Sequence, residues 1–399
     1  MMKSVSRRHN TKKIRNSRPN IVLSLQSVVV YSLIMDVYVL IEPLYKDSLW
    51  CRQYLDGLKY EAGRNSIPLV FIESLDGYMP PENGICTLLG STPQWLRKMS
   101  ADLARNTIRC IVVNPDCSIE TGMTSQIHID FHKAMQMAAS YFAIHHRNHT
   151  VLFGVNPSST TDELKAQAFR TAFPAGTISI HESSVSQSCA TLTQKYPLVD
   201  SVLCCNELVA IALLRQLQLD KRAIPREIWL MTFGRSAIAN YIKPSLTAIE
   251  VDHILVGRQI IKIAQFLLKN HAFSTLCCTL DANIIPAETT DNASFIVSPI
   301  ERHIGDQASE NSMNFYQDPI IEELCNLDRL FSSILPSDFT LLQGVANNRK
   351  YAEIAESLGM SENAIKYRMK RMMGLAEVDH RLAMLSLLER YLGEDWAKG

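Results

Sequence analysis

The sequence predicts an α/β protein whose parallel-sheet body is followed by a small all-α domain at the C-terminus. Short, continuously apolar runs alternate with amphipathic helical stretches from residue 36 to about residue 297, a pattern typical of parallel sheets covered by helices on both faces. The alternation ends in residues 301–330, and helical spacing alone describes the apolar residues that follow. A chain of 399 residues has room for two or three domains.

The composition argues against several functional classes. Hydrophobic residues make up 47% of the chain and charged residues 20%, an ordinary globular balance. The 40 basic residues offset the 40 acidic ones, but local charge decides whether a protein binds nucleic acid. There is no phosphate-binding glycine loop and no G-x-S-x-G or H-E-x-x-H motif, so we expect neither enzyme activity nor a cofactor. The ten cysteines lack metal-ligand spacing, so we expect no metal site. We also expect their thiols to be reduced and the protein to be cytoplasmic.

The first 35 residues differ from the rest of the chain. Residues 1–20 contain seven basic residues and no acidic one, and residues 21–35 are largely apolar. A basic start before an apolar run resembles a signal peptide or a membrane anchor. The run is shorter than the ~20 residues that a spanning helix needs, and Asp36 interrupts it. We therefore favour a disordered extension, or a biological start at Met35, over a membrane anchor.

The body consists of strands and helices in alternation. We expect strands at 37–43, 67–73, 86–90, 108–115, 127–129, 150–155, 177–182, 200–206, 228–233 and 246–251. Amphipathic spacing predicts helices at about 49–64, 95–103, 132–145, 164–172 and 256–268. Crossovers in such sheets are right-handed, and ligands bind at the carboxyl ends of the strands.

Residues 301–330 connect this body to the C-terminal domain. The polar piece from Gly305 to Asn314 predicts a linker. A helix follows at 320–330, and we expect it to couple the body to the domain that follows. Its apolar stripe consists of Ile321, Leu324, Leu327 and Leu330.

Residues 351–373 predict two helices joined by a tight turn. Gly359 ends the first helix, because glycine adopts the left-handed conformation that a helix stop needs. Ser361 begins the second helix as its N-cap. The apolar face of the first helix is formed by Ile354, Ala355 and Leu358.

The second of these helices has two chemically different faces. The major groove of DNA admits a helix with a polar, basic face, where asparagine pairs with adenine and lysine reaches guanine or phosphate. Arg349 and Lys350, which precede the first helix, are expected to contact phosphate. The alternatives are an ordinary solvated hairpin and a hairpin that binds a partner protein. The apolar stripe consists of Ile365, Met369 and Met372, and the polar face of Asn363, Lys366, Tyr367 and Lys370.

The matching pieces of a family pattern occur between residues 335 and 392. They are Leu335-Pro336, Leu341-Leu342, Gly344, Glu353-Ile354-Ala355-Glu356, Leu358, Ser361-Glu362, Ile365-Lys366, Val378 and Arg381. This segment resembles the LuxR-type helix-turn-helix domain. Asp338-Phe339 and Ala376-Glu377 depart from the family pattern. These departures concern the details of the last turn and not the assignment of the domain. The resemblance implies dimer contacts by a last helix that carries Leu382, Leu385, Leu388 and Leu392.

Four pieces of the body, residues 43–62, 128–173, 205–217 and 232–252, occur in an order that resembles the LacI/ribose-binding-protein sensor. The resemblance implies a two-lobed, periplasmic-binding-protein-like fold that closes on a small effector. Phe233-Gly234-Arg235 departs from the sugar-binding members, which have an aspartate after the aromatic residue. Because arginine binds anions, we consider an anionic effector as well as a neutral sugar. The alternative is a pocket that is empty or that binds protein. The expected effector contacts are Tyr45, Asp47, Trp50, Asp116, Lys165, Asn206, Glu207 and Arg235.

Together these patterns predict a ligand-responsive, DNA-binding transcriptional regulator. We expect double-stranded DNA, a sugar-like or anionic effector and a second copy of the chain as partners, because twofold symmetry pairs two reading heads with two half-sites. A membrane-tethered or solute-binding receptor is the main alternative. The expected parts are an extension at 1–35, a LacI-like sensing domain at 36–300, a linker and coupling helix at 301–330, and a LuxR-type helix-turn-helix domain at 331–399.

Overall fold

A computed structural model describes residues 36–290 and 315–398, except residues 83, 116–118, 120–121 and 182–183. The predicted extension at 1–35 and the predicted linker from Gly305 to Asn314 lie outside the described residues. Within the described ranges, no helix combines the length and the apolar character that crossing a membrane requires.

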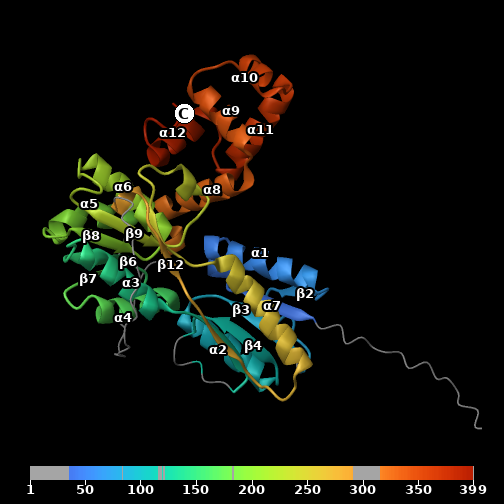
Figure 1. Ribbon diagram of the computed structural model, residues 1–399. Coiled ribbons are helices and arrows are strands. Elements are labelled where there is room, and N and C mark those ends of the chain that lie inside the picture. The colour runs from blue at the N-terminus through green and yellow to red at the C-terminus, as the bar shows by residue number, and fades with distance from the viewer. Residues whose placement is uncertain are drawn as a thin grey trace, which may run out of the picture. The chain divides into compact units, whose positions relative to one another are not determined.

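The first lobe is built on a six-stranded parallel sheet with the strand order β11-β5-β4-β3-β1-β2 (Figure 1). Alternate residues of its strands face opposite layers. Val37 and Val39 pack against α1 and α7, whereas Tyr38 and Leu40 pack against α2. The elements are β1 Val37–Ile41, α1 Leu49–Arg64, β2 Leu69–Ile72, β3 Ile85–Leu89, α2 Pro93–Arg105, β4 Arg109–Val113, β5 Thr124–Ile129, α7 His253–Lys269 and β11 Cys277–Leu280.

Helices α1 and α7 lie side by side at a close approach that glycine permits (Figure 1). A Cβ atom on Gly57 of α1 would lie 2.0 Å from the carbonyl oxygen of Ile254, and one on Gly257 of α7 would lie 2.0 Å from that of Tyr54. No side chain fits at either position, so the two glycines set the helix separation.

The second lobe has the strand order β12-β10-β9-β8-β6-β7 and is parallel except for β12, which pairs with β10 antiparallel. Helices α3 and α4 share one core with this sheet, and α5 and α6 share another. The predicted parallel sheets with covered faces are thus confirmed. The elements are α3 Phe131–Ile144, β6 Thr150–Val155, α4 Thr160–Ala172, β7 Thr177–Ile180, α5 Val185–Lys195, β8 Ser201–Cys204, α6 Glu207–Leu219, β9 Trp229–Phe233, β10 Thr247–Glu250 and β12 Asn283–Ile285.

Five helices form the C-terminal region. The predicted coupling helix is present as α8 and is longer than expected; the four residues of its predicted stripe are fully buried. The turn between α10 and α11 has the predicted chemistry: Gly359 has φ 64°, and Ser361 Oγ accepts a hydrogen bond from the Ala364 N–H at 3.2 Å. The helices are α8 Pro319–Ser333, α9 Pro336–Ala346, α10 Tyr351–Leu358, α11 Glu362–Leu375 and α12 Arg381–Leu392.

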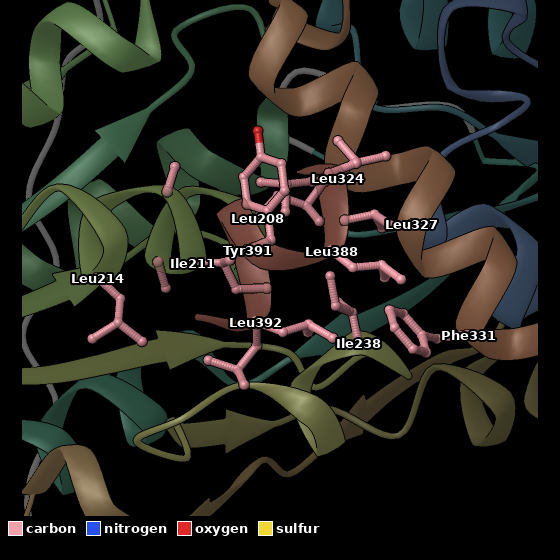
Figure 2. Packing of buried hydrophobic residues seen from close by; sticks show 14 of the residues in the cluster. Leu208, Ile211, Leu214, Ile238, Leu324, Leu327, Phe331, Leu388, Tyr391 and Leu392 are labelled. Atoms are coloured by element: carbon pink, nitrogen blue, oxygen red, sulfur yellow. The ribbon is translucent and has the colours of Figure 1, made fainter. Parts of the chain in front are cut away.

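One hydrophobic core joins the second lobe to the C-terminal helices. Figure 2 shows Leu388 and Leu392 of α12 among side chains of α6 and α8. The expectation that the leucine face of α12 is free for a second copy of the chain therefore fails for these two residues, which are covered within the chain. Leu382, at the other end of the predicted face, is 67% exposed.

Candidate functional site

A pocket lies where the carboxyl ends of strands from both sheets meet. Ser91 and Asn114 follow β3 and β4 of the first lobe, and Asn156, Asn206 and Arg235 follow β6, β8 and β9 of the second. The pocket holds about 1130 Å³ of space, its open mouth included. It lies at the position where parallel sheets bind ligands.

The structure brings most of the predicted effector residues together at this pocket. Asp47 is exposed and is not among the lining side chains, and Asp116 lies outside the described residues. The predicted residues that line the pocket are Tyr45, Trp50, Lys165, Asn206, Glu207 and Arg235.

Several lining residues were not predicted. Asn114 stands directly after β4, where the prediction had chosen Asp116, and its Oδ1 accepts a hydrogen bond from the Ile129 N–H at 2.8 Å. The rule that ligands bind at strand ends would have found it. The same rule would have found His253, which follows the predicted strand at 246–251. Tyr316 carried no such signal, because it belongs to the turn before the coupling helix.

Lys165 is a buried cation held in the pocket wall. Its Nζ lies 3.0 Å from Asp162 Oδ1, donates to the Cys205 carbonyl oxygen at 2.7 Å, and stands 5.1 Å from the ring centroid of Phe233. The ion pair offsets its charge within the wall. Arg235, in contrast, is exposed at the pocket and bonds only weakly to Asn240 Oδ1, at 3.3 Å. It is therefore the better placed of the two cations for an anionic group.

Glu207 supplies a carboxyl group that burial keeps protonated. It is 3% exposed at the first turn of α6 and accepts a hydrogen bond from the Ser236 N–H. Burial raises its pKa to about 8, so the group is largely neutral at pH 7 and can donate as well as accept. Burial also lowers the pKa of His253 to about 4, and its Nδ1 lies 2.8 Å from Gln53 Oε1. The pocket thus offers mostly neutral hydrogen-bonding groups beside aromatic rings.

A second candidate site is the polar face of α11. The predicted stripe beneath it is buried, with Ile365 fully buried and Met369 and Met372 each 1% exposed. All four predicted face residues are exposed, as are Arg349 and Lys350 ahead of α10. Lys366 pairs with Glu362 at 2.7 Å on the surface, which costs little to break. The polar face consists of Asn363, Lys366, Tyr367 and Lys370.

Two other basic residues of α11 are used within the chain. Arg368 Nη1 lies 2.8 Å from Asp338 Oδ1, and that carboxylate is 2% exposed. Arg371 Nη2 donates to the Ser333 carbonyl oxygen, at the end of α8, at 3.2 Å. The positive charge of the polar face therefore comes from Lys370, and from Lys366 when its surface pair with Glu362 opens.

Comparisons with known proteins identify the fold of the body. Residues 139–286 match a family described as a periplasmic binding protein-like domain. The body has a periplasmic-binding-protein-like fold. A comparison with curated proteins found no match.

Solved transcriptional regulators share this fold. A complex of the transcriptional regulator CelR with cellobiose has a TM-score of 0.54 at 16% identity, over 64% of this chain and 84% of that one. The Lac repressor bound to ONPG has a TM-score of 0.54 at 14% identity, over 69% of this chain and 87% of that one. A LacI family regulator from Enterococcus faecalis V583 with bound ribose has a TM-score of 0.53 at 13% identity, over 65% and 100%. At these identities the likeness concerns the fold.

Proposed function

We propose that the chain is a ligand-responsive transcriptional regulator in which an effector, bound between the two lobes, controls DNA binding by α10 and α11. The observation that carries the proposal is the exposed Asn, Lys and Tyr face of α11 above a buried stripe. A helix with this face suits the major groove. In this proposal residues 331–399 form a LuxR-type helix-turn-helix domain, residues 36–300 sense the effector, and α8 couples them.

The pocket favours a small polar effector with a ring. The Oδ1 atoms of Asn114 and Asn206, at the strand ends, accept backbone N–H groups, which leaves their Nδ2 groups to donate to a ligand. Tyr45, Trp50 and Tyr316 offer ring faces and edges. Among the solved neighbours, the CelR complex contains cellobiose and the Enterococcus faecalis regulator contains ribose. We propose a sugar-like effector, with Arg235 able to take an anionic substituent such as a phosphate.

The test begins with selection of duplex DNA from a random-sequence pool by the full chain. We expect a recurrent site that the chain binds at least about 10³-fold more tightly than scrambled DNA, with an affinity that falls steeply as salt rises. Cellobiose, ribose and ribose 5-phosphate are then added separately to find one that shifts the affinity. Enrichment of no site, together with no salt-sensitive binding, would overturn the proposal and favour a protein partner for this surface.

A further inference from the structure

Helix α8 begins at the pocket. Phe315 and Tyr316, in the turn Phe315–Gln317 immediately before the helix, both line the cavity. The Tyr316 ring meets the edge of Tyr45, from the first lobe, at a centroid distance of 5.6 Å and an interplanar angle of 86°. The Trp50 ring in turn contacts Tyr45, at a centroid distance of 5.6 Å. The Phe315 ring meets His181, from the second lobe, at 5.5 Å. The turn therefore touches both lobes.

Asp318 fixes this turn to the second lobe. Its Oδ1 caps α8 by accepting from the Ile320 N–H at 3.0 Å, and its Oδ2 accepts from the Val185 N–H, at the start of α5, at 2.9 Å. The side chain is 2% exposed. The direction in which α8 leaves the pocket is thus set by two hydrogen bonds to one buried carboxylate.

Farther along α8, Asp328 ties the helix to both lobes at once. Its Oδ2 accepts from Arg52 Nη2, on α1 of the first lobe, at 2.8 Å. Its Oδ1 accepts from the Ala237 N–H, after β9 of the second lobe, at 3.0 Å. Asp328 is fully buried, so loss of the Arg52 contact would leave a carboxylate without its charge partner. A change in the separation of the lobes would therefore strain one of these two bonds.

The far end of α8 contacts the helix that carries the polar face. Arg329 on α8 pairs with Glu377, just after α11, at 2.9 Å. Arg371 of α11 donates to the last residue of α8, Ser333, at 3.2 Å. The contacts are continuous from the pocket, through α8, to α11.

We propose that α8 is part of the effector site, where Tyr316 contacts the effector, and that the Arg52–Asp328 contact holds α8 to the first lobe. This contact, which we call the latch, transmits a change in the separation of the lobes to α11. An effector that binds beside Tyr45 and Tyr316 acts directly on the first turn of α8. The role of α11 in DNA binding rests on the proposed function, whereas the latch itself does not.

The test uses the full chain with Asp328→Asn, Arg52→Gln and the double variant. Arg258→Gln is the matched control, because Arg258 pairs with Glu61 at 2.9 Å within the first lobe and not with α8. The side chains of Arg258 and Glu61 are 31% and 7% exposed, similar to the 26% and 0% of Arg52 and Asp328. Amide hydrogen exchange is followed in peptides from α8 and α11. We expect exchange there to rise at least about fivefold in the latch variants and to stay unchanged in Arg258→Gln. The double variant should resemble Asp328→Asn and be less affected than Arg52→Gln, because asparagine leaves no unpaired charge in the buried position.

Equal effects in the latch and control variants, or effects confined to α1, would overturn the latch. Should Arg52→Gln not fold, Arg52→Lys takes its place, since it keeps the charge and loses the guanidinium geometry. Tyr316→Ala should likewise raise exchange in α8, and it should weaken binding of whichever of cellobiose, ribose or ribose 5-phosphate shifts DNA affinity. A wild-type chain that binds no DNA would sink the proposed function, while the exchange result would still decide the latch.

Discussion

Glu207 is the residue whose ionisation most directly affects the pocket. Its folded pKa of about 8 lies above the ordinary value of 4.5, so the folded chain holds this proton more tightly than the unfolded chain. The stabilising contribution is complete below pH 4.5 and is lost as the pH rises through about 8. We expect the free energy of unfolding to fall between pH 5 and 8 by a contribution on the order of a few kcal/mol, at ~1.4 kcal/mol per unit of pKa shift.

Glu207→Gln should remove that contribution. Urea denaturation at pH 5.5 and 8.5 measures it, with Glu250→Gln as the control because Glu250 is exposed at the end of β10. We expect the pH dependence to flatten in Glu207→Gln and to persist in Glu250→Gln. Parallel profiles for wild type and Glu207→Gln would contradict the buried, protonated carboxyl group.

Arg349 and Lys350 are expected to contact phosphate rather than bases. Both are exposed ahead of α10. Arg349→Ala and Lys350→Ala should weaken binding to the selected site and to scrambled DNA alike, and each should reduce the slope of log affinity against log salt by about one. Lys398→Ala removes an exposed charge elsewhere in the C-terminal region and is the control. A loss confined to the selected site would instead assign these residues to base contacts.

At the scale of elements, local chemistry predicted the helices and strands that have clear boundaries. The helix at 49–64 and the strand at 150–155 were placed at their observed bounds, because capping residues and apolar runs mark both. Helix α5 was missed because its sequence is rich in serine and threonine, and only Val185, Cys189 and Leu192 are buried in it. The antiparallel pairing of β12 depends on a return from the other lobe, which no local pattern encodes.

The α1–α7 packing makes a prediction that two glycines of one helix can test. Gly57→Ala should destabilise the first lobe by roughly 1–3 kcal/mol or more, because its Cβ would overlap the Ile254 backbone. Gly63→Ala, in the same helix, meets nothing within 4 Å and should stabilise by up to about 1 kcal/mol. Thermal unfolding compares the two. Equal effects would mean that α1 and α7 do not pack at this distance.

At the scale of the molecule, the sequence predicted a pocketed two-lobed body and a terminal helical region, but not how they join. The apolar face of α12 was assigned to a second copy of the chain, whereas Leu388 and Leu392 pack into the core of the second lobe. Tyr316 could not be assigned to the pocket because its neighbours Tyr45 and Trp50 lie near the opposite end of the chain. Apolar periodicity shows that a face is buried and leaves open what buries it.

The shared core predicts that the second lobe and the C-terminal region unfold together. Leu388→Ala should cost about 2–5 kcal/mol and lower the stability of both, because the residue is fully buried between α6 and α8 (Figure 2). Leu382→Ala, an exposed leucine of the same helix, should change stability by less than about 0.5 kcal/mol. Amide hydrogen exchange in α6 and α11 is compared between the two variants, and we expect both helices to lose protection only in Leu388→Ala. Loss of protection in α11 alone would show that the two regions are independent.

The proposed role of α11 as the DNA-reading helix of a ligand-sensing protein depends on two residues of its polar face. Binding of the full chain to the selected site and to scrambled DNA is compared for wild type and the Asn363→Ala, Lys366→Ala double variant, with Lys398→Ala as the control. Both substituted residues lie off the buried stripe, so circular dichroism should show an unchanged fold. We predict a loss of about 1–3 kcal/mol per base contact on the selected site and little change on scrambled DNA. Undiminished binding of the double variant to the selected site would contradict the claim.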